Sequence, residues 1–276
     1  MKNFLRNFKH ISINRGYLGI TSSLRVLPDF LIIGAKRCGT TTLYENLSEH
    51  PCIAKSEHDN IGFFNDNYQL GLNWYKSHFV TTYEKNQILK KYGKFATYDV
   101  TTSYMRNHEN INKIKKTLPN SKIIVILRNP IDRAFSEYNQ NLIDNPNIEQ
   151  FEKIILKELE TFSNIYKLDT SSIVKKLNLI GKGFYEKQLK KWFEIFSRNS
   201  ILVLSTEEFE KEPNKIYSKI FKFLELPEYE VKNSKKYNKN SYVKMDDKLR
   251  KTLFEFYKPY NEELFNLIKI RFDWNE

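Results

Sequence analysis

The stretch that decides the fold is residues 28–42, which read PDFLIIGAKRCGTTT. Residues 30–33 form a short apolar run with β-branched side chains, as in a central strand of a parallel sheet. Gly34 and Gly39 bound a tight turn in which the backbone needs positive φ or close approach. A helix then begins at Thr40. The stretch therefore predicts a buried strand, a glycine-bounded loop and a helix.

The loop between Gly34 and Gly39 is typical of an anion site, because free N–H groups at a helix start favour negative charge. Its glycine spacing matches half of the Walker pattern of nucleotide-binding loops, in which a lysine follows the second glycine. Here Thr40 has that place, and Lys36 and Arg37 lie inside the loop. The loop suits one terminal phosphate and its attached group better than a triphosphate. The alternative is a glycine turn with two solvated charges.

The composition is that of a globular, strongly basic protein. Its 276 residues suffice for one large α/β domain, and 45 basic against 33 acidic residues give a net charge of +12. This charge favours an anionic partner such as a nucleotide, a polyanion or a membrane surface, although it also serves solubility. We find no zinc-type spacing and no nucleic-acid recognition motif, so we expect no metal and no nucleic-acid partner.

The sequence also bears on compartment and domain limits. The two cysteines, Cys38 and Cys52, do not form a disulfide framework and fit a reducing compartment. No run of 18 apolar residues exists, so we expect no transmembrane segment and a cytoplasmic location. Residues 1–27 contain five basic residues and no acid. We expect a basic N-terminal arm over 1–27, packed on a domain that spans 28–276.

The strongest strand signal is KIIVIL at 122–127, and it is followed by Arg128 and a helix that contains Ser136. Open α/β sheets bind ligands at the carboxyl ends of their strands, and an arginine with a hydroxyl suits a second phosphate. The alternative is a salt bridge at the strand end. Further strands are predicted at 95–100 and 201–204. Helices are predicted at 110–118, 148–162, 183–196 and 216–224, and two more at 246–257 and 261–270, separated by Pro259.

The resulting fold prediction is a single α/β domain with a central parallel sheet flanked by helices, P-loop-like. Two polar segments stand out from it. Residues 55–60, KSEHDN, precede Phe63 and Phe64 and suggest an active-site loop, although a solvated turn is an equal alternative. Residues 232–244 form a polar loop with five lysines.

These pieces together resemble the sulfotransferases that use 3′-phosphoadenosine 5′-phosphosulfate (PAPS), most closely the heparan-sulfate type. Residues 30–41 resemble the family's 5′-phosphosulfate loop, and residues 127–136 its 3′-phosphate motif. Residues 183–192 and 240–264 resemble the segments that follow. The resemblance implies PAPS as co-substrate, with the product adenosine 3′,5′-bisphosphate (PAP). The implied binding residues are Lys36, Arg37, Cys38, Gly39, Thr40, Thr41, Arg128, Ser136, Tyr185, Lys235 and Lys236.

The activity implied by this resemblance is transfer of a sulfuryl group from PAPS to a hydroxyl or amine, expected to be on a carbohydrate. Lys36 and Arg37 would stabilise the charge that grows as the S–O bond breaks. No metal is needed for this scheme. Residues 60–80 and 140–180 are expected to shape the acceptor site.

Two positions depart from the family pattern. Arg37 stands where the family loop usually has a lysine, so either Arg37 acts purely as a charge or Lys36 takes the part of the lysine. Asn60 stands where heparan-type relatives have a glutamate base. An amide cannot be a base, so we expect His58 to remove the proton, with Asp59 orienting or replacing it.

Two rival functions remain open from the residues. A P-loop phosphotransferase or kinase also needs a glycine loop after a strand, but Thr40 at the lysine position speaks against it. A non-catalytic module that binds a polyanion would explain both the charge and the missing base.

Overall fold

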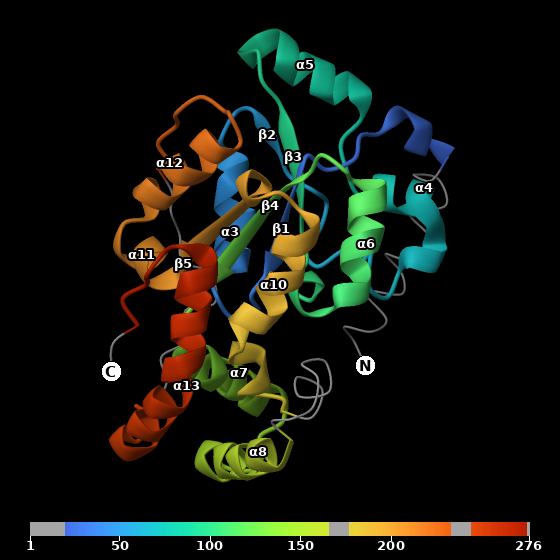
Figure 1. Cartoon of the computed structure of the whole chain (residues 1–276). Helices are drawn as coiled ribbons and strands as arrows, with labels where there is room; N and C mark the ends of the chain where they lie inside the picture. Colours follow the sequence, from blue (N-terminus) through green and yellow to red (C-terminus); the bar gives the residue numbers. More distant parts are fainter. Residues whose placement is uncertain (1–19, 166–176, 233–243, 275–276) are drawn as a thin grey trace.

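The computed structural model describes residues 20–165, 177–232 and 244–274, which are built around one parallel sheet (Figure 1). The sheet has five strands in the order β2-β3-β1-β4-β5, and every neighbouring pair is parallel. The strands are β1 (Phe30–Gly34), β2 (Ile53–Ala54), β3 (Ala96–Val100), β4 (Lys122–Leu127) and β5 (Ile201–Ser205). The predicted α/β fold with a central parallel sheet is confirmed.

Strand β1 lies at the centre of the sheet, between β3 and β4. Phe30 is in register with Tyr98 on one side and with Lys122 on the other. All five residues of β1 are buried, which explains why the sequence run is apolar without alternation. The central position also places the loop after β1 in the middle of the carboxyl edge of the sheet.

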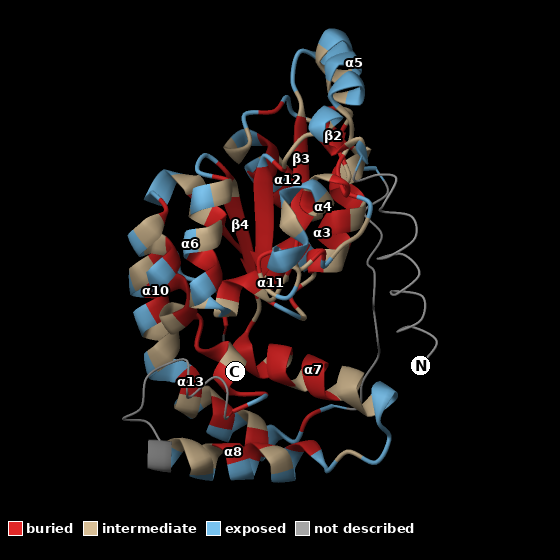
Figure 2. Ribbon diagram, turned by 90° about the vertical axis from the view of Figure 1, so that its right-hand side faces the viewer, coloured by how far each residue is buried: buried red, intermediate tan, exposed pale blue. Residues whose placement is uncertain are grey.

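Helices cover both faces of the sheet. In Figures 1 and 2, α6 and α10 lie on one face, and α3, α11 and α12 lie on the other. The helices are α3 (Thr40–Asn46), α4 (Gly71–Lys76), α5 (Thr82–Tyr92), α6 (His108–Thr117), α7 (Pro130–Asp144), α8 (Phe151–Ile165), α10 (Tyr185–Ile195), α11 (Thr206–Lys211), α12 (Pro213–Phe223) and α13 (Asp247–Ile268).

A second apolar cluster extends the molecule beyond the carboxyl edge of the sheet. It joins α7, α8 and α13 through buried residues such as Ile131, Ile155 and Leu253, and it is separate from the cluster around the strands. Figure 2 shows the buried faces of α7 and α8 turned toward each other. Because α7 belongs to this layer and starts at the end of β4, it connects the second cluster to the sheet edge where the predicted site lies.

Helix α13 differs from the prediction of two helices separated by Pro259. It runs unbroken over 22 residues with Pro259 inside it. A proline removes one backbone hydrogen bond, to the carbonyl four residues earlier. Pro259 and Glu255 are both exposed, so water can take the freed bond. Leu253 and Leu264, on either side, are buried and hold the helix in place.

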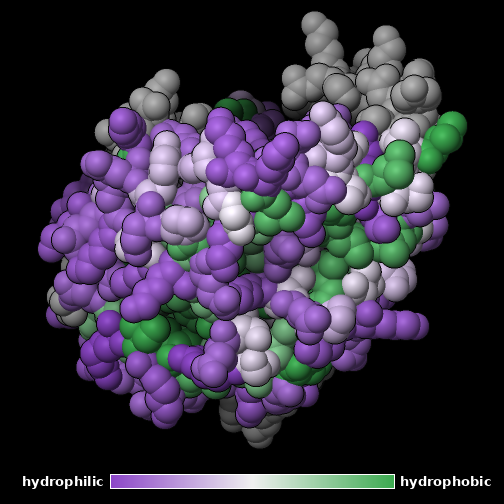
Figure 3. Space-filling view, turned by 90° about the horizontal axis from the view of Figure 1, so that it is seen from above, coloured by the Kyte–Doolittle hydropathy of each residue, from purple (hydrophilic) through white to green (hydrophobic). Residues whose placement is uncertain are grey.

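The described end of the predicted N-terminal arm contacts the domain. Arg25 donates a hydrogen bond to the carbonyl of Phe79 at 2.6 Å, and the amide of Val26 donates to the carbonyl of Val80 at 3.1 Å. Hydrophilic side chains cover most of the face seen from above in Figure 3, as the lysine-rich composition leads one to expect. Within the described residues, no helix has the length and apolarity needed to cross a membrane.

Candidate active site

The loop between β1 and α3 has the backbone that its glycines predict. Gly34 and Gly39 have φ of 156° and 88°. A Cβ on Gly34 would lie 3.0 Å from the sulfur of Met105 and 3.3 Å from the carbonyl of Thr102, so the glycine lets the turn after β3 approach the loop. Arg37 has φ of 71°, in the left-handed region, where a residue with a Cβ costs about 1–3 kcal/mol. Such strain is typical of functional loops.

The two predicted phosphate motifs meet through Arg37. Its Nε donates to the hydroxyl of Ser136 at 3.2 Å, and its Nη1 donates to Oε1 of Gln140 at 3.3 Å. Arg128 contacts the loop backbone, with its Nη1 3.5 Å from the carbonyl of Arg37. Three predicted nucleotide residues from three segments are thus brought together, and Gln140 joins them from one turn further along α7.

The start of α7 is fixed by contacts that sequence reasoning only partly identified. Asn129 is the N-cap, and its side chain accepts from the amide of Ile131 at 3.0 Å. The amide of Asn129 donates to Glu207 at 2.8 Å. The hydroxyl of Tyr185 donates to the carbonyl of Arg128 at 2.9 Å, and its side chain is fully buried. Tyr185 therefore holds the backbone of Arg128, directly after β4, from the buried side.

Cys38 faces the core, although it lies within the loop. It is fully buried, and burial raises the pKa of its thiol to about 11. Its carbonyl accepts a hydrogen bond from Thr206 at 2.9 Å. Thr40 is also buried, whereas Gly39 and Thr41 are half-buried. From Cys38, only the backbone is placed to face a ligand.

Lys36 belongs to a cluster of charges that the sequence did not predict. Its Nζ lies 3.2 Å from Oε1 of Glu137, which also accepts from Lys182 at 2.7 Å, while Oε2 accepts from Arg133 at 2.7 Å. The Glu137 side chain is 2% exposed. Burial alone would raise the pKa of its carboxyl, but the charges of Arg133 and Lys182 hold that pKa at about 2. Glu137 is therefore ionised at every physiological pH.

The sequence carried a partial signal for this cluster. Arg133 and Glu137 are four residues apart on a predicted helix, a spacing that places them on one face. Ser136 and Gln140 have the same spacing on the neighbouring face. Helix α7 thus presents Ser136 to Arg37 and Glu137 to Lys36. Lys182 comes from a distant segment, so no local pattern indicated it.

Lys182 is held in place by a strongly bonded segment. The carboxylate of Glu158 accepts from the amides of Asn178, Leu179 and Ile180 at 2.8–3.1 Å. The hydroxyl of Tyr257 donates to the carbonyl of Ile180 at 2.7 Å. A Cβ on Gly183 would lie 2.7 Å from the same hydroxyl. The glycine of the predicted 183–185 motif is therefore required by packing.

The predicted base residues lie on the loop that enters from β2. The His58 ring packs edge-on to His78 with centroids 6.3 Å apart, and its Nε2 is 3.7 Å from Glu57. Burial, followed by the charge of Glu45, raises the pKa of Asp59. Tyr44 ties the loop to α3 by donating to the carbonyl of Ser56 at 2.7 Å. Both predicted base residues are half-buried.

Asn60, at the usual glutamate position, lies against the turn after β3. The backbone amide of Asn60 donates to the carbonyl of Val100 at 2.6 Å, and its side-chain Oδ1 accepts from the backbone amide of Thr102 at 3.4 Å. Thr102 in turn lines a pocket together with Lys36. Asn60 therefore connects this loop, through Thr102, to the residues around Lys36.

Two of the residues predicted to bind the nucleotide, Lys235 and Lys236, lie outside the described residues. Among residues 20–165, 177–232 and 244–274, no group of three or more histidine, cysteine or acidic side chains is arranged to hold a metal ion.

Solved sulfotransferases share this architecture. A sulfotransferase from Alicyclobacillus acidocaldarius superposes with a TM-score of 0.69 at 24% identity, covering 91% of this chain and all of the other. A mouse sulfotransferase, SULT7A1, solved in complex with PAP, superposes with a TM-score of 0.51 at 17% identity and covers 94% of both chains. At these identities the likeness supports the fold.

Curated relatives include heparan sulfate enzymes. The chain is 23% identical to the membrane-associated sulfotransferase kil1 of Dictyostelium discoideum, over 92% of this chain and 68% of that protein. It is 30% identical to a bifunctional heparan sulfate N-deacetylase/N-sulfotransferase 1 of Caenorhabditis briggsae, over 76% of this chain. It is 26% identical to human heparan sulfate glucosamine 3-O-sulfotransferase 3B1, over 92% of this chain.

The lengths of these proteins differ from that of the chain. The matched part is only 24% of the nematode protein and 66% of the human one. The model of the sulfotransferase domain matches residues 27–262, which include the loop after β1, the Arg128 motif and most of α13. Since this match spans most of the sequence, the chain belongs to the sulfotransferase domain family, and residues 27–262 form a PAPS-dependent sulfotransferase domain.

Proposed function

We propose that the protein transfers the sulfuryl group of PAPS to a hydroxyl or amine of a carbohydrate. The single observation that carries the assignment of the site is the meeting of Arg37, Arg128 and Ser136 at the carboxyl edge of the sheet. The carbohydrate class is supported by relatives whose names specify heparan sulfate and glucosamine.

In this proposal the nucleotide lies across the loop after β1. Arg128 and Ser136 hold the 3′-phosphate, since a guanidinium and a hydroxyl make charge-assisted hydrogen bonds to phosphate oxygens. Lys36, Arg37 and the amides of residues 38–41 hold the 5′-phosphosulfate. The hydrogen bonds of Arg37 to Ser136 and Gln140 then exchange for bonds to the ligand.

The chemical step is an in-line displacement at sulfur. The acceptor oxygen or nitrogen forms a bond to sulfur as the bond from sulfur to the bridging oxygen breaks, and the electron pair stays on the phosphate of PAP. Negative charge therefore grows on the bridging oxygen. Lys36 and Arg37 belong to the loop that would hold the phosphosulfate, and their fixed positive charge would stabilise this transition state; a single such donor contributes on the order of 10²–10³-fold.

The acceptor proton passes to a base on the loop that contains residues 55–60. We assign this role to His58, with Asp59 orienting it or taking its place, because Asn60 cannot accept the proton. General-base assistance contributes about 10²–10⁴-fold. Lys235 and Lys236 complete the proposal as residues that close over the nucleotide or meet an anionic acceptor.

The test is a transfer assay with PAPS as donor and two classes of acceptor. Heparosan and N-desulfated heparan represent carbohydrates with free hydroxyls and amines, and 4-nitrophenol represents phenols. Mass spectrometry of the acceptors should show sulfation of a saccharide and no modification of the phenol. Sulfation of the phenol alone contradicts the carbohydrate assignment. Transfer of phosphate from ATP, with no transfer from PAPS, contradicts the whole proposal.

A further inference from the structure

Asp99 is a buried carboxylate that the proposed chemistry does not use. It lies next to the end of β3, and its side chain is fully buried. The hydroxyls of Tyr75 and Tyr104 donate to its Oδ2 at 2.9 and 3.0 Å, and the hydroxyl of Thr101 donates to its Oδ1 at 2.8 Å. Tyr75 comes from α4, and Tyr104 begins the 3-10 turn after β3 (η4, Tyr104–Arg106). These four residues, the Asp99 cluster, thus join β3 to α4 and to the turn that follows β3.

The charge of Asp99 sets the direction of the hydrogen bonds in this cluster. An ionised carboxylate only accepts, so each of the three hydroxyls gives its single hydrogen to Asp99. The oxygens of Thr101 and Tyr104 then keep lone pairs for a second bond. A protonated carboxyl or an amide carries a donor of its own, which competes for those lone pairs. Ionised Asp99 therefore prepares the two hydroxyls to accept from other groups.

The second bonds reach the segment that follows the loop of residues 55–60. The amide of Gly62 donates to the hydroxyl of Thr101 at 3.2 Å, and the amide of Phe64 donates to the hydroxyl of Tyr104 at 3.4 Å. Both amides thus bond oxygens whose direction Asp99 sets. The loop that carries the proposed base is attached through them to the end of β3.

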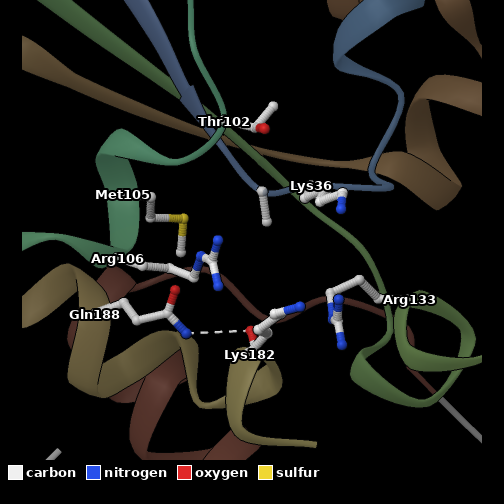
Figure 4. A pocket seen from close by; sticks show the side chains of 8 residues that line it. Lys36, Thr102, Met105, Arg106, Arg133, Lys182 and Gln188 are labelled. Atoms are coloured by element: carbon white, nitrogen blue, oxygen red, sulfur yellow. Dashed lines mark hydrogen bonds between the residues drawn. The ribbon is translucent and has the colours of Figure 1, made fainter. Parts of the chain in front are cut away.

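The turn after β3 also contacts the loop after β1. A Cβ on Gly34 would lie 3.0 Å from the sulfur of Met105 and 3.3 Å from the carbonyl of Thr102. Figure 4 shows the side chains of Met105 and Thr102 on the same small pocket as Lys36. Asp99 therefore lies behind a turn that borders both loops of the proposed site.

The surroundings of Asp99 do not stabilise its charge with a cation. The titratable groups that face it are Tyr75 from α4 and Tyr104 from η4, and burial raises the pKa of both, so they stay neutral. On β1 its neighbour in register is the apolar Leu31. Burial raises the pKa of Asp99 to about 6, although the three hydroxyls act in the opposite direction. Because folding raises this pKa, ionisation costs stability as the pH rises from 3.8 through about 6, and a role in stabilising the whole fold does not account for the charge.

We propose that Asp99 is a positioning residue, whose carboxylate orients the hydroxyls of Thr101 and Tyr104 and through them holds the loop with the proposed base at the edge of the sheet. The inference rests on the proposed function, because it assigns the base to that loop. Asp99 is buried behind the loop and acts through its neighbours rather than on a substrate. Protonation of Asp99 should loosen the loop.

The first measurement is hydrogen exchange at the amides of Gly62 and Phe64, corrected for the intrinsic effect of pH, in protein saturated with PAP. We expect their protection in the wild type to be at least about tenfold higher at pH 8 than at pH 5, as loss of one charge-assisted hydrogen bond allows. Asp99→Asn should show the low protection at both pH values. Amides of β4 report opening of the whole fold, so a change confined to Gly62 and Phe64 identifies local loosening.

Tyr75→Phe is a matched variant that separates the bond to Asp99 from the bonds to the loop. The Tyr75 hydroxyl donates to Asp99, whereas its ring stacks on Phe63 with centroids 4.3 Å apart, a contact that phenylalanine retains. Loss of this donor disfavours the ionised carboxylate, so the pH at which protection falls should rise. Protection at pH 9 should stay as in the wild type. A purely structural hydroxyl would not move that pH.

Thr101→Val tests the connection to the loop, because it removes the acceptor for the amide of Gly62. This variant should abolish the pH dependence of protection at Gly62, and it decides the question if Asp99→Asn does not fold. Adding Asp99→Asn to Thr101→Val should lower protection at Gly62 little further, since the two residues act in series.

Turnover connects the attachment of the loop to the reaction. With heparosan and N-desulfated heparan as acceptors, Asp99→Asn should lower kcat at pH 8 at least about tenfold, because misplacing a reacting group by about 1 Å can cost about 10²-fold. PAP affinity should be unchanged, since the proposed nucleotide contacts come from the loop after β1 and from Arg128 and Ser136 rather than from β3.

Protection that does not depend on pH in the wild type, or that survives in Asp99→Asn, overturns the proposal. A loosened loop with wild-type kcat overturns the positioning role and leaves the proposed function standing. If the wild type sulfates no saccharide, the proposed function fails, and hydrogen exchange alone decides whether Asp99 holds the loop.

Discussion

Replacing Glu137 with glutamine removes the carboxylate shared by Lys36, Arg133 and Lys182. The pKa of Glu137 falls from 4.5 to about 2 on folding, which corresponds to about 3 kcal/mol of stability at pH 7. The substitution also leaves the buried Arg133 without its counter-charge, and breaking a buried pair typically costs about 3–5 kcal/mol. We therefore expect Glu137→Gln to lower the free energy of unfolding by at least about 3 kcal/mol.

The predicted loss of unfolding free energy depends on pH, which distinguishes it from the loss caused by a packing defect. Because folding lowers the pKa, the stabilisation is fully present above pH 4.5 and is lost as the pH falls toward about 2. The difference between wild type and variant should shrink to about 1 kcal/mol at pH 3. Urea denaturation at pH 7 and pH 3 measures it, with the exposed Glu255→Gln as control. A loss below about 1 kcal/mol at pH 7, or one unchanged at pH 3, refutes the reasoning.

The remaining predictions concern the nucleotide, the packing and the base. Arg128→Ala and Ser136→Ala should each weaken PAP binding by about 1.5–3 kcal/mol in calorimetry, and wild-type affinity in both removes the site assignment. Gly183→Ala should lower stability by about 1–3 kcal/mol in thermal or urea unfolding, since its Cβ would overlap a tyrosine hydroxyl at 2.7 Å; an unchanged unfolding curve contradicts that packing. His58→Ala should slow turnover about 10²–10⁴-fold with PAP affinity intact, and Asp59→Asn should slow it if the carboxylate orients or replaces the histidine. If both variants turn over like the wild type, the base lies elsewhere.

Much of the fold was readable from local signals. The strand predicted at 122–127 is β4, Lys122–Leu127, because a run of apolar β-branched residues fits only a strand buried on both faces. The loop between Gly34 and Gly39 was also predictable, because the spacing of the two glycines is a local property of the chain. The helix break predicted at Pro259 was wrong because the rule for proline describes an isolated helix, whereas packing on both sides of Pro259 holds α13 together.

The site was predictable only in part. Arg128 and Ser136 follow a strong strand, so the end of that strand indicated them. Glu137 and Lys182 were missed because they are 45 residues apart and meet only in the folded chain. The burial of Cys38 within a loop that looks exposed in sequence is likewise a tertiary effect, set by the strand it follows and by α11.

The measurement that tests the central claim most directly is calorimetric titration of the wild-type protein with PAP and with ATP. A site built from the loop after β1, Arg128 and Ser136 has a place for a 3′-phosphate, which ATP lacks. We predict tight binding of PAP, at least about tenfold tighter than ATP, with most of that difference lost in Arg128→Ala. Tighter binding of ATP, or PAP binding that is indifferent to Arg128, would contradict the account.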